Sequence, residues 1–268
     1  MFEYLIAKRY LRSKHRLNFI SIISVLSTLG VTIGVAALVI VLSVFNGFGS
    51  LVTTMLINFD PHVRVTAEDT EKYIDLIEYL DKSSKVQSYS KFAQGKIILI
   101  NNSTVEILNI KGVPIENEES TSRIEERVKF GSFDISNNDE NISGIILSLP
   151  IALRLSVRTG DTVYATSASQ IRNTITRLSI PNTKRFIVTG IYEISNKEYA
   201  LEYSFTSLSS AQKLLNMRSR ISGLEIILND LDDSESFKRE LLDNFSEHGL
   251  NVNTWYDLHK DLYRVMLI

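Results

Sequence analysis

The hydrophobic and polar positions divide the chain into a short polar head, one long apolar stretch and a mixed remainder. No charged residue occurs between Leu17 and Phe59. This stretch is much longer than the roughly 20 residues that cross a bilayer, so it predicts a transmembrane helix with an extension beyond the membrane, over residues 19–59. Asp60-Pro61 is expected to end the helix, because a residue before proline disfavours helical backbone.

Beyond residue 60 the pattern changes to short apolar runs separated by polar turns. Alternating or continuous apolar runs predict strands at 62–67, 94–101, 104–113, 144–149, 162–167, 185–193, 201–208, 223–230 and 250–255. Helices are expected at 69–83, 150–157, 209–217 and 233–249, and 116–134 is expected to be a loop with a short helix. Two β-α-β units thus enclose a strand-rich middle, which predicts an α+β domain in two lobes, the outer one built from both ends.

Basic residues are concentrated in front of the apolar stretch. Residues 1–18 hold a single acid, Glu3, and the basic residues Lys8, Arg9, Arg12, Lys14 and Arg16. The positive-inside rule places this amphipathic segment in the cytoplasm and the chain after Phe48 across the membrane. A cleavable signal peptide also starts with basic residues, but its apolar core is only about 7–15 residues long.

Small residues recur at helical spacing inside the apolar stretch. Ser27, Gly30, Gly34 and Ala37 share one face of the predicted helix, where small side chains allow a second membrane helix to approach closely. The alternative is that glycine is simply more frequent in membrane spans than in soluble helices.

The amino-acid composition and the absence of motifs argue against several classes of function. The 268 residues include no cysteine, which excludes a disulfide scaffold and any cysteine-ligated metal. The part after the basic head has no run of lysine or arginine, so nucleic-acid binding is not expected. The sequence has no phosphate loop, HExxH or GxSxG motif, and its four histidines are far apart. We therefore expect no enzyme, no metal and no cofactor.

The segment 167–185 is unusual because it is far longer than an ordinary hairpin loop. It contains four basic residues and no acid, together with the apolar residues Ile171, Ile175, Leu178, Ile180 and Pro181. Long loops with exposed apolar residues are often binding elements. Two extended strands that pack these residues on their own sheet are the alternative.

Several segments together carry a resemblance to a known family. In chain order they are AKRYLRSKHRLNFISIISVLSTLGVTIGVAALVIVLSVFNGF, PHVRV, ILSLPIALRLSVRTGDTVYATSAS, FIVTGIYE, SSAQKLLNM and NTWYDLHKDL. This order resembles the LolC/LolE permease subunits of the lipoprotein-releasing ABC transporter, within the wider group of MacB and FtsX permeases. The resemblance covers almost the whole chain.

The resemblance implies an inner-membrane permease subunit with a periplasmic domain over 60–256. Its Porter-like lobe would comprise about 60–125 and 218–256, and its Sabre-like lobe about 126–217. The implied partners are a LolD-like ABC ATPase subunit, a second permease half, lipoprotein clients, membrane lipid and a LolA-like periplasmic carrier. The long hairpin matches the carrier-recruiting Hook, and its docking candidates are Gln170, Ile171, Arg172, Ile175, Arg177, Leu178, Ile180 and Pro181.

Helix geometry adds candidates for a lipid cavity between helices. Phe45, Phe48, Val52 and Met55 lie on the outer end of the first helix. Family members have three further membrane helices, so residues 257–268 are expected to approach a missing second span and the chain to be a truncated permease. A MacB-like efflux permease, an FtsX-like regulatory permease and a single-span envelope adaptor stay open as alternatives.

Overall fold

The computed structural model describes residues 6, 18–57, 61–67, 72–115, 124–136, 142–169, 183–194, 197–246, 249–258 and 260. The chain divides into two compact units, Met1–Thr54 and Met55–Ile268, and each is described by itself. The first unit consists mainly of one helix, and the second holds all the strands.

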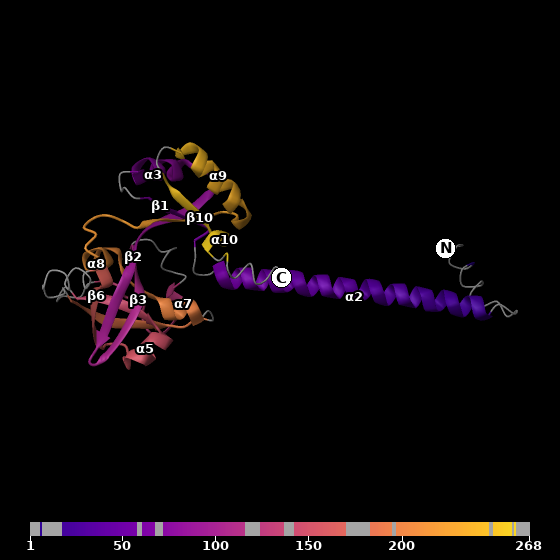
Figure 1. Ribbon diagram of the computed structural model, residues 1–268, viewed down its shortest axis with the longest axis horizontal. Coiled ribbons are helices and arrows are strands. Elements are labelled where there is room, and N and C mark those ends of the chain that lie inside the picture. Colours follow the sequence, from indigo (N-terminus) through magenta and orange to yellow (C-terminus); the bar gives the residue numbers. More distant parts are fainter. Residues whose placement is uncertain are drawn as a thin grey trace. The chain divides into compact units, whose positions relative to one another are not determined.

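Helix α2 (Asn18–Ile57) follows the long apolar stretch (Figure 1). Its segment Ile22–Phe45 has a mean hydropathy of 2.5, and none of its most apolar window is buried within the chain. The hydroxyl groups of Thr28 and Thr32 donate to the carbonyl oxygens four residues earlier, at 2.8 and 2.7 Å. These polar groups are therefore satisfied inside the helix, as a lipid environment requires.

The second unit contains two lobes, and the one that we call the helical lobe is built from both ends of the unit. Its strands are β1 (Val63–Thr66), β9 (Gly223–Leu228) and β10 (Asn251–Thr254), and β1 lies between the other two, antiparallel to both. Helices α3 (Lys72–Lys82) and α9 (Ser234–Asn244) pack their apolar faces on this sheet. The core is formed by Val63, Val65, Leu76, Leu224, Ile226, Phe237 and Leu241, all fully buried.

Six strands close into a ring, which we call the barrel. They are β2 (Val86–Asn101), β3 (Thr104–Val113), β5 (Ser143–Ser148), β6 (Thr162–Ser167), β7 (Lys184–Tyr192) and β8 (Tyr203–Ser207). The pairing order β2-β3-β8-β5-β7-β6 returns to β2, with β3–β8 and β5–β7 parallel. Because alternate residues of each strand point inward, the interior is apolar, formed by Ile97, Leu99, Ile110, Ile145, Val163, Ala165, Phe186 and Val188.

Two short helices complete the barrel core, and each begins after a serine that caps its N-terminus. Ser148 ends β5 and its hydroxyl accepts the N–H of Ile151, so it caps α5 (Leu149–Leu155). Ser207 likewise ends β8 and caps α8 (Leu208–Leu214). A serine at this position satisfies an otherwise unpaired N–H at the helix start, which explains why strand gives way to helix at once.

The outside of the barrel has two different walls. On the covered wall, Val113, Ile146, Tyr192 and Phe205 are buried against Ile124 and Ile135, and β4 (Val128–Gly131) adds an edge strand to β7. The bare wall comprises Ile98 and Ile100 on β2, Val105 and Ile107 on β3, and Tyr164 on β6. These five residues share a face because Ile100 lies opposite both Val105 and Tyr164, and Ile98 lies opposite Ile107.

Three sequence expectations are wrong in detail. The segment 201–208 is not strand throughout, because Leu201 and Glu202 end helix α7 (Lys197–Glu202). Strand β4 falls in a segment that was expected to be a loop with a short helix. The strand is only four residues long, so the short alternation of Val128, Lys129 and Phe130 does not mark it, and pairing with β7 reveals it. Strand β2 also begins eight residues earlier than expected, at Val86, because its first half belongs to a second sheet.

Candidate functional site

The predicted packing face of the membrane helix is open within this chain. Ser27, Gly30, Gly34 and Ala37 all lie in α2 and are exposed. A Cβ atom added at Gly30 or Gly34 would meet nothing within 4 Å, so no contact among the described residues requires glycine there. The role of this face in helix packing stays a prediction.

The lipid-cavity candidates also lie on α2. The side chain of Phe45 is 70% exposed. Phe48, Val52 and Met55 belong to the same helix, but their side chains lie outside the described part of the structure. Their lining of a cavity stays a prediction.

The predicted docking hairpin lies between two neighbouring strands of the barrel. All of its candidates, Gln170, Ile171, Arg172, Ile175, Arg177, Leu178, Ile180 and Pro181, fall outside the described residues. Its two ends are described: β6 ends at Ser167 and β7 begins at Lys184, and Ala165 pairs with Lys184 across them. The segment therefore starts and finishes at one end of a single antiparallel pair.

The base of this hairpin combines positive charge with apolar surface. Burial and the neighbouring ammonium of Lys213 lower the pKa of Lys184. Arg185 is exposed and pairs with Tyr164, which belongs to the bare wall. On that wall Val105, Ile107 and Tyr164 are 54%, 65% and 45% exposed. Such a surface suits a protein partner that is apolar and acidic rather than a small anionic ligand.

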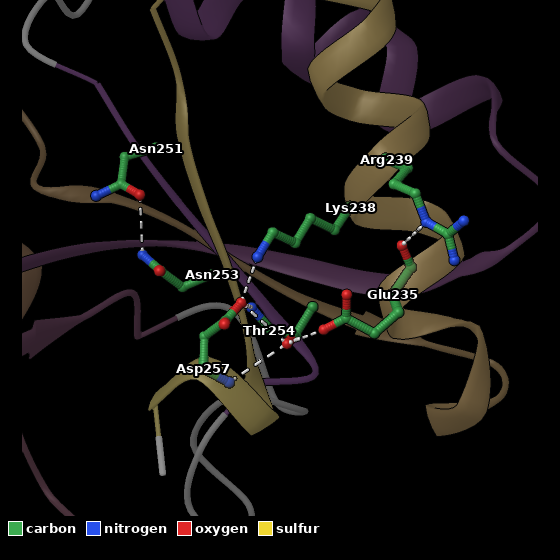
Figure 2. Close-up of polar contacts among 7 residues, drawn as sticks. All are labelled: Glu235, Lys238, Arg239, Asn251, Asn253, Thr254 and Asp257. Carbon is green, nitrogen blue, oxygen red and sulfur yellow. Dashed lines mark hydrogen bonds and ion pairs between the residues drawn. The ribbon is translucent and has the colours of Figure 1, made fainter. Parts of the chain in front are cut away.

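Hydrogen bonds between Thr254 and Asp257, which we call the clasp, fix the chain where it leaves the helical lobe (Figure 2). Thr254 ends β10 and starts α10 (Trp255–Leu258). The N–H of Thr254 donates to the Asp257 carboxylate at 3.2 Å, and the N–H of Asp257 donates to the Thr254 hydroxyl at 3.4 Å. This reciprocal pair is a capping box, which makes the start of α10 well defined.

Helix α9 holds the clasp from the side. Lys238 forms an ion pair with Asp257, and the Thr254 hydroxyl donates to Glu235 at 2.7 Å (Figure 2). Burial alone would raise the pKa of Asp257, but Lys238 and Thr254 outweigh burial and hold this pKa below its usual range. The stabilisation is therefore present above the ordinary aspartate pKa and is lost as the pH falls through the lowered one.

No catalytic centre stands out among the residues that the structure describes. Within them, no group of histidine, aspartate and glutamate residues is arranged to hold a metal ion. His62 has a structural role, since its Nδ1 accepts the N–H of Leu228 at 3.1 Å and ties the start of β1 to β9. The expected absence of enzymatic activity stays a prediction.

Comparison with known families identifies the class of protein. The family model of the MacB-like periplasmic core domain matches residues 24–243. The chain belongs to this family. The predicted fold class, an N-terminal apolar helix followed by an α+β domain of this type, is confirmed.

Curated relatives narrow the class further. Over 96% of this chain, the lipoprotein-releasing system transmembrane protein LolC of Xylella fastidiosa strain 9a5c is 27% identical, and 61% of that protein is covered. The Neisseria meningitidis serogroup B protein of the same name is 25% identical, with 93% and 60% coverage. The LolE protein of Haemophilus influenzae is 24% identical, with 97% and 63% coverage. The resemblance to LolC/LolE-type permease subunits is thereby confirmed, and the chain spans about three-fifths of its relatives' length.

Solved structures are similar at a greater distance. The periplasmic region of MacB from Actinobacillus actinomycetemcomitans is 13% identical, with a TM-score of 0.47 over 78% of this chain and 95% of that one. The extracellular domain of the transporter YknZ from Gram-positive bacteria is 12% identical, with a TM-score of 0.46 over 72% and 99% of the two chains.

Proposed function

We propose that this chain works in a permease subunit of an ABC transporter that extracts lipoproteins from the inner membrane and passes them to a periplasmic carrier. The observation that carries the proposal is the alignment of more than nine-tenths of the chain with proteins named for lipoprotein release. ATP would be hydrolysed by a separate LolD-like subunit, and a second permease half would complete the membrane part. The N-terminus would lie in the cytoplasm and the domain after α2 in the periplasm, as the basic head predicts.

The physical task explains why a membrane helix and a carrier are both needed. Exposing acyl chains to water costs about 25 cal/mol for each Å² of apolar surface, so a lipoprotein does not leave the bilayer unaided. The apolar outer part of α2, with Phe45 exposed, is the proposed wall of a cavity that shields these chains. Phe48, Val52 and Met55 complete this proposal, and the face of Ser27, Gly30, Gly34 and Ala37 is proposed to pack on a neighbouring helix.

Carrier docking is assigned to the hairpin between β6 and β7. Its ends belong to adjacent strands of a closed barrel, which is a rigid base for a projecting element. Its sequence combines isoleucine and leucine with arginine and has no acid, so it suits the apolar and acidic rim of a carrier's lipid pocket. Lys184 and Arg185 continue this positive charge at the base.

Site-specific photo-crosslinking from position 175 tests the docking step. A photoreactive amino acid replaces Ile175 in the full-length protein in native membranes, and mass spectrometry identifies the captured species. Capture of a small soluble periplasmic lipid carrier supports lipoprotein release. Capture of another envelope protein, or of this protein's own neighbouring segments alone, contradicts it and favours an efflux or regulatory permease.

Substitution of the same hairpin gives the quantitative test. Ile175→Asp with Leu178→Asp is expected to weaken carrier binding at least about 100-fold, because charges replace two apolar side chains that the proposal places against the carrier. Leu153→Asp on α5, where the side chain is 69% exposed and lies outside the bare wall, is the matched control for an added charge on the barrel. Copurification of the ATPase subunit reports intact assembly in both variants. Unchanged carrier affinity in the double variant removes the hairpin from the docking surface.

A further inference from the structure

The helical lobe and the barrel are joined by a narrow connection. Strand β2 runs through both, since residues 86–92 pair with β9 and residues 93–101 pair with β3. The chain returns from the barrel to β9 through residues 215–222. The two crossings lie side by side, because the N–H of Ser222 donates to the Phe92 carbonyl and the N–H of Gln94 donates to the Ser222 hydroxyl, both at 2.8 Å.

The covalent connection between the lobes is narrow, because it consists only of the middle of strand β2 and the turn-containing segment 215–222. Hinges between domains are short stretches of backbone whose φ and ψ angles absorb a rotation. The hydrogen bonds between the crossings keep them together but do not prevent the lobes from bending about them. Any fixed orientation of the barrel therefore needs contacts beyond the two crossings.

A buried ion triad supplies such a contact. Arg64 on β1 and Glu225 on β9 lie directly opposite each other in the helical lobe. The Nη2 and Nε atoms of Arg64 donate to Glu225 Oε1 at 2.9 and 3.2 Å. Lys111, on β3 of the barrel, reaches the other oxygen, Glu225 Oε2, at 2.8 Å. One carboxylate thus binds a cation from each lobe.

The triad is shielded from water and rests on an aromatic ring at the crossing. The side chains of Lys111, Glu225 and Arg64 are only 4%, 11% and 15% exposed. The Arg64 guanidinium and the Lys111 ammonium lie 5.5 and 5.8 Å from the centre of the Phe92 ring, within the range of cation–π attraction. Phe92 is the last residue of β2 that pairs with β9.

Burial decides what the triad can contribute. Removing charged groups from water costs about as much as their mutual attraction returns, so a buried ion pair is weak support for net stability. Its energy depends steeply on geometry, because a displaced lysine would be a buried charge without a partner. The triad therefore makes any rotation that separates Lys111 from Glu225 unfavourable. Its main effect is to fix the orientation of the barrel relative to the helical lobe.

We propose that the ion pair between Lys111 and Glu225 locks the barrel to the helical lobe, so that the two lobes move as one rigid body. The helical lobe contains both chain connections, to α2 before β1 and to α10 after β10. Any displacement imposed through either connection would then reach the barrel without loss at the hinge. This proposal concerns the lobes alone and stands independently of the carrier and of lipoprotein release.

Distance measurement between spin labels tests the lock. The 268 residues contain no cysteine, so Asp243→Cys on α9 and Leu153→Cys on α5 introduce two defined labelling sites, both at exposed positions. Double electron–electron resonance on the full-length protein in detergent or nanodiscs then reports the lobe-to-lobe distance distribution. The parent protein is expected to give one narrow distribution.

Lys111→Met is the informative variant. Glu225 keeps Arg64 as its partner in this variant, so no charge is left buried alone and the fold is expected to persist. We expect the distance distribution to broaden or to gain a second population, and Lys111→Gln to behave likewise. Lys111→Arg, which retains the charge, should stay close to the parent.

A control variant and two outcomes that would contradict the proposal complete the experiment. Lys96→Met removes an exposed lysine from the same strand pair and should leave the distribution narrow. A parent-like distribution in Lys111→Met or in Lys111→Gln, with a parent-like circular dichroism spectrum, overturns the proposal. Broadening in Lys111→Arg equal to that in Lys111→Met also overturns it, because the charge would then be irrelevant.

Discussion

The covered and bare walls of the barrel have similar apolar composition but different surroundings. On the covered wall Phe205 and Tyr192 are at most 1% exposed, and Ile146 is fully buried. On the bare wall Ile107 is 65% exposed although it occupies an equivalent outward position on its strand. The difference shows that an outward apolar residue in a barrel contributes to the core only where another segment of the chain covers it.

The covered wall and the barrel interior are filled by different parts of the chain. Ile124 and Ile135 pack on Ile146, Tyr192 and Phe205. The barrel interior, in contrast, is filled by the strands and by α5 and α8. The covered wall is therefore a second, smaller core, and the bare wall is apolar surface that the described part of the chain leaves largely uncovered. Three substitutions put these two walls to the test.

Phe205→Ala on the covered wall is expected to have the largest effect. It removes a buried ring that stacks edge-to-face on Tyr192 with 5.5 Å between ring centres. The free energy of unfolding should fall by about 3–5 kcal/mol, because the cavity left behind cannot fully collapse. Denaturant unfolding of the full-length protein, followed by circular dichroism, measures it. A loss below about 1 kcal/mol would mean that the covering segment is not part of a packed core.

Tyr192→Phe should have an intermediate effect on the same wall. The tyrosine hydroxyl donates to the part-buried Tyr203 carbonyl at 2.9 Å, and the variant loses this hydrogen bond. The expected loss is about 1–2 kcal/mol at neutral pH. Urea unfolding curves of parent and variant, compared at equal temperature, give this value.

The stability difference between the parent protein and Tyr192→Phe should depend on pH. Burial raises the pKa of Tyr192, so its neutral form is favoured in the folded state. The contribution of its hydroxyl is fully present below the ordinary tyrosine pKa of about 10 and declines as the pH rises above it. The stability difference between parent and Tyr192→Phe should therefore shrink above that pH. A difference that grows there would contradict the buried position.

Ile107→Thr on the bare wall should have the smallest effect. Its side chain is mostly exposed, and threonine retains the β-branching that favours strands, so the change in unfolding free energy should stay within about 0.5 kcal/mol. Thermal unfolding of the isolated full-length protein provides the comparison. A large loss would show that another part of the protein covers the bare wall.

The sequence determined the elements whose signals are local. The charge-free stretch predicted α2, and the pattern predicted helices beginning at 150 and 209, one residue after the observed starts of α5 and α8, without the serine caps being recognised. The TWYD segment at 254–257 also carries a capping-box signal, which our sequence analysis did not use and which the clasp now reveals. Strand β4 was missed because four residues are too few for their alternation to indicate a strand, and pairing with β7 defines it.

What only the tertiary structure decided is the meeting of distant residues. Arg64, Lys111 and Glu225 are separated by dozens of positions, and nothing in their neighbours marks them as a buried triad. The closure of six strands into a ring, and the resulting covered and bare walls, likewise depend on pairing between strands far apart in the chain. Hydrophobic periodicity reports which face of an element is apolar, whereas strand register and the order of neighbours decide what that face meets.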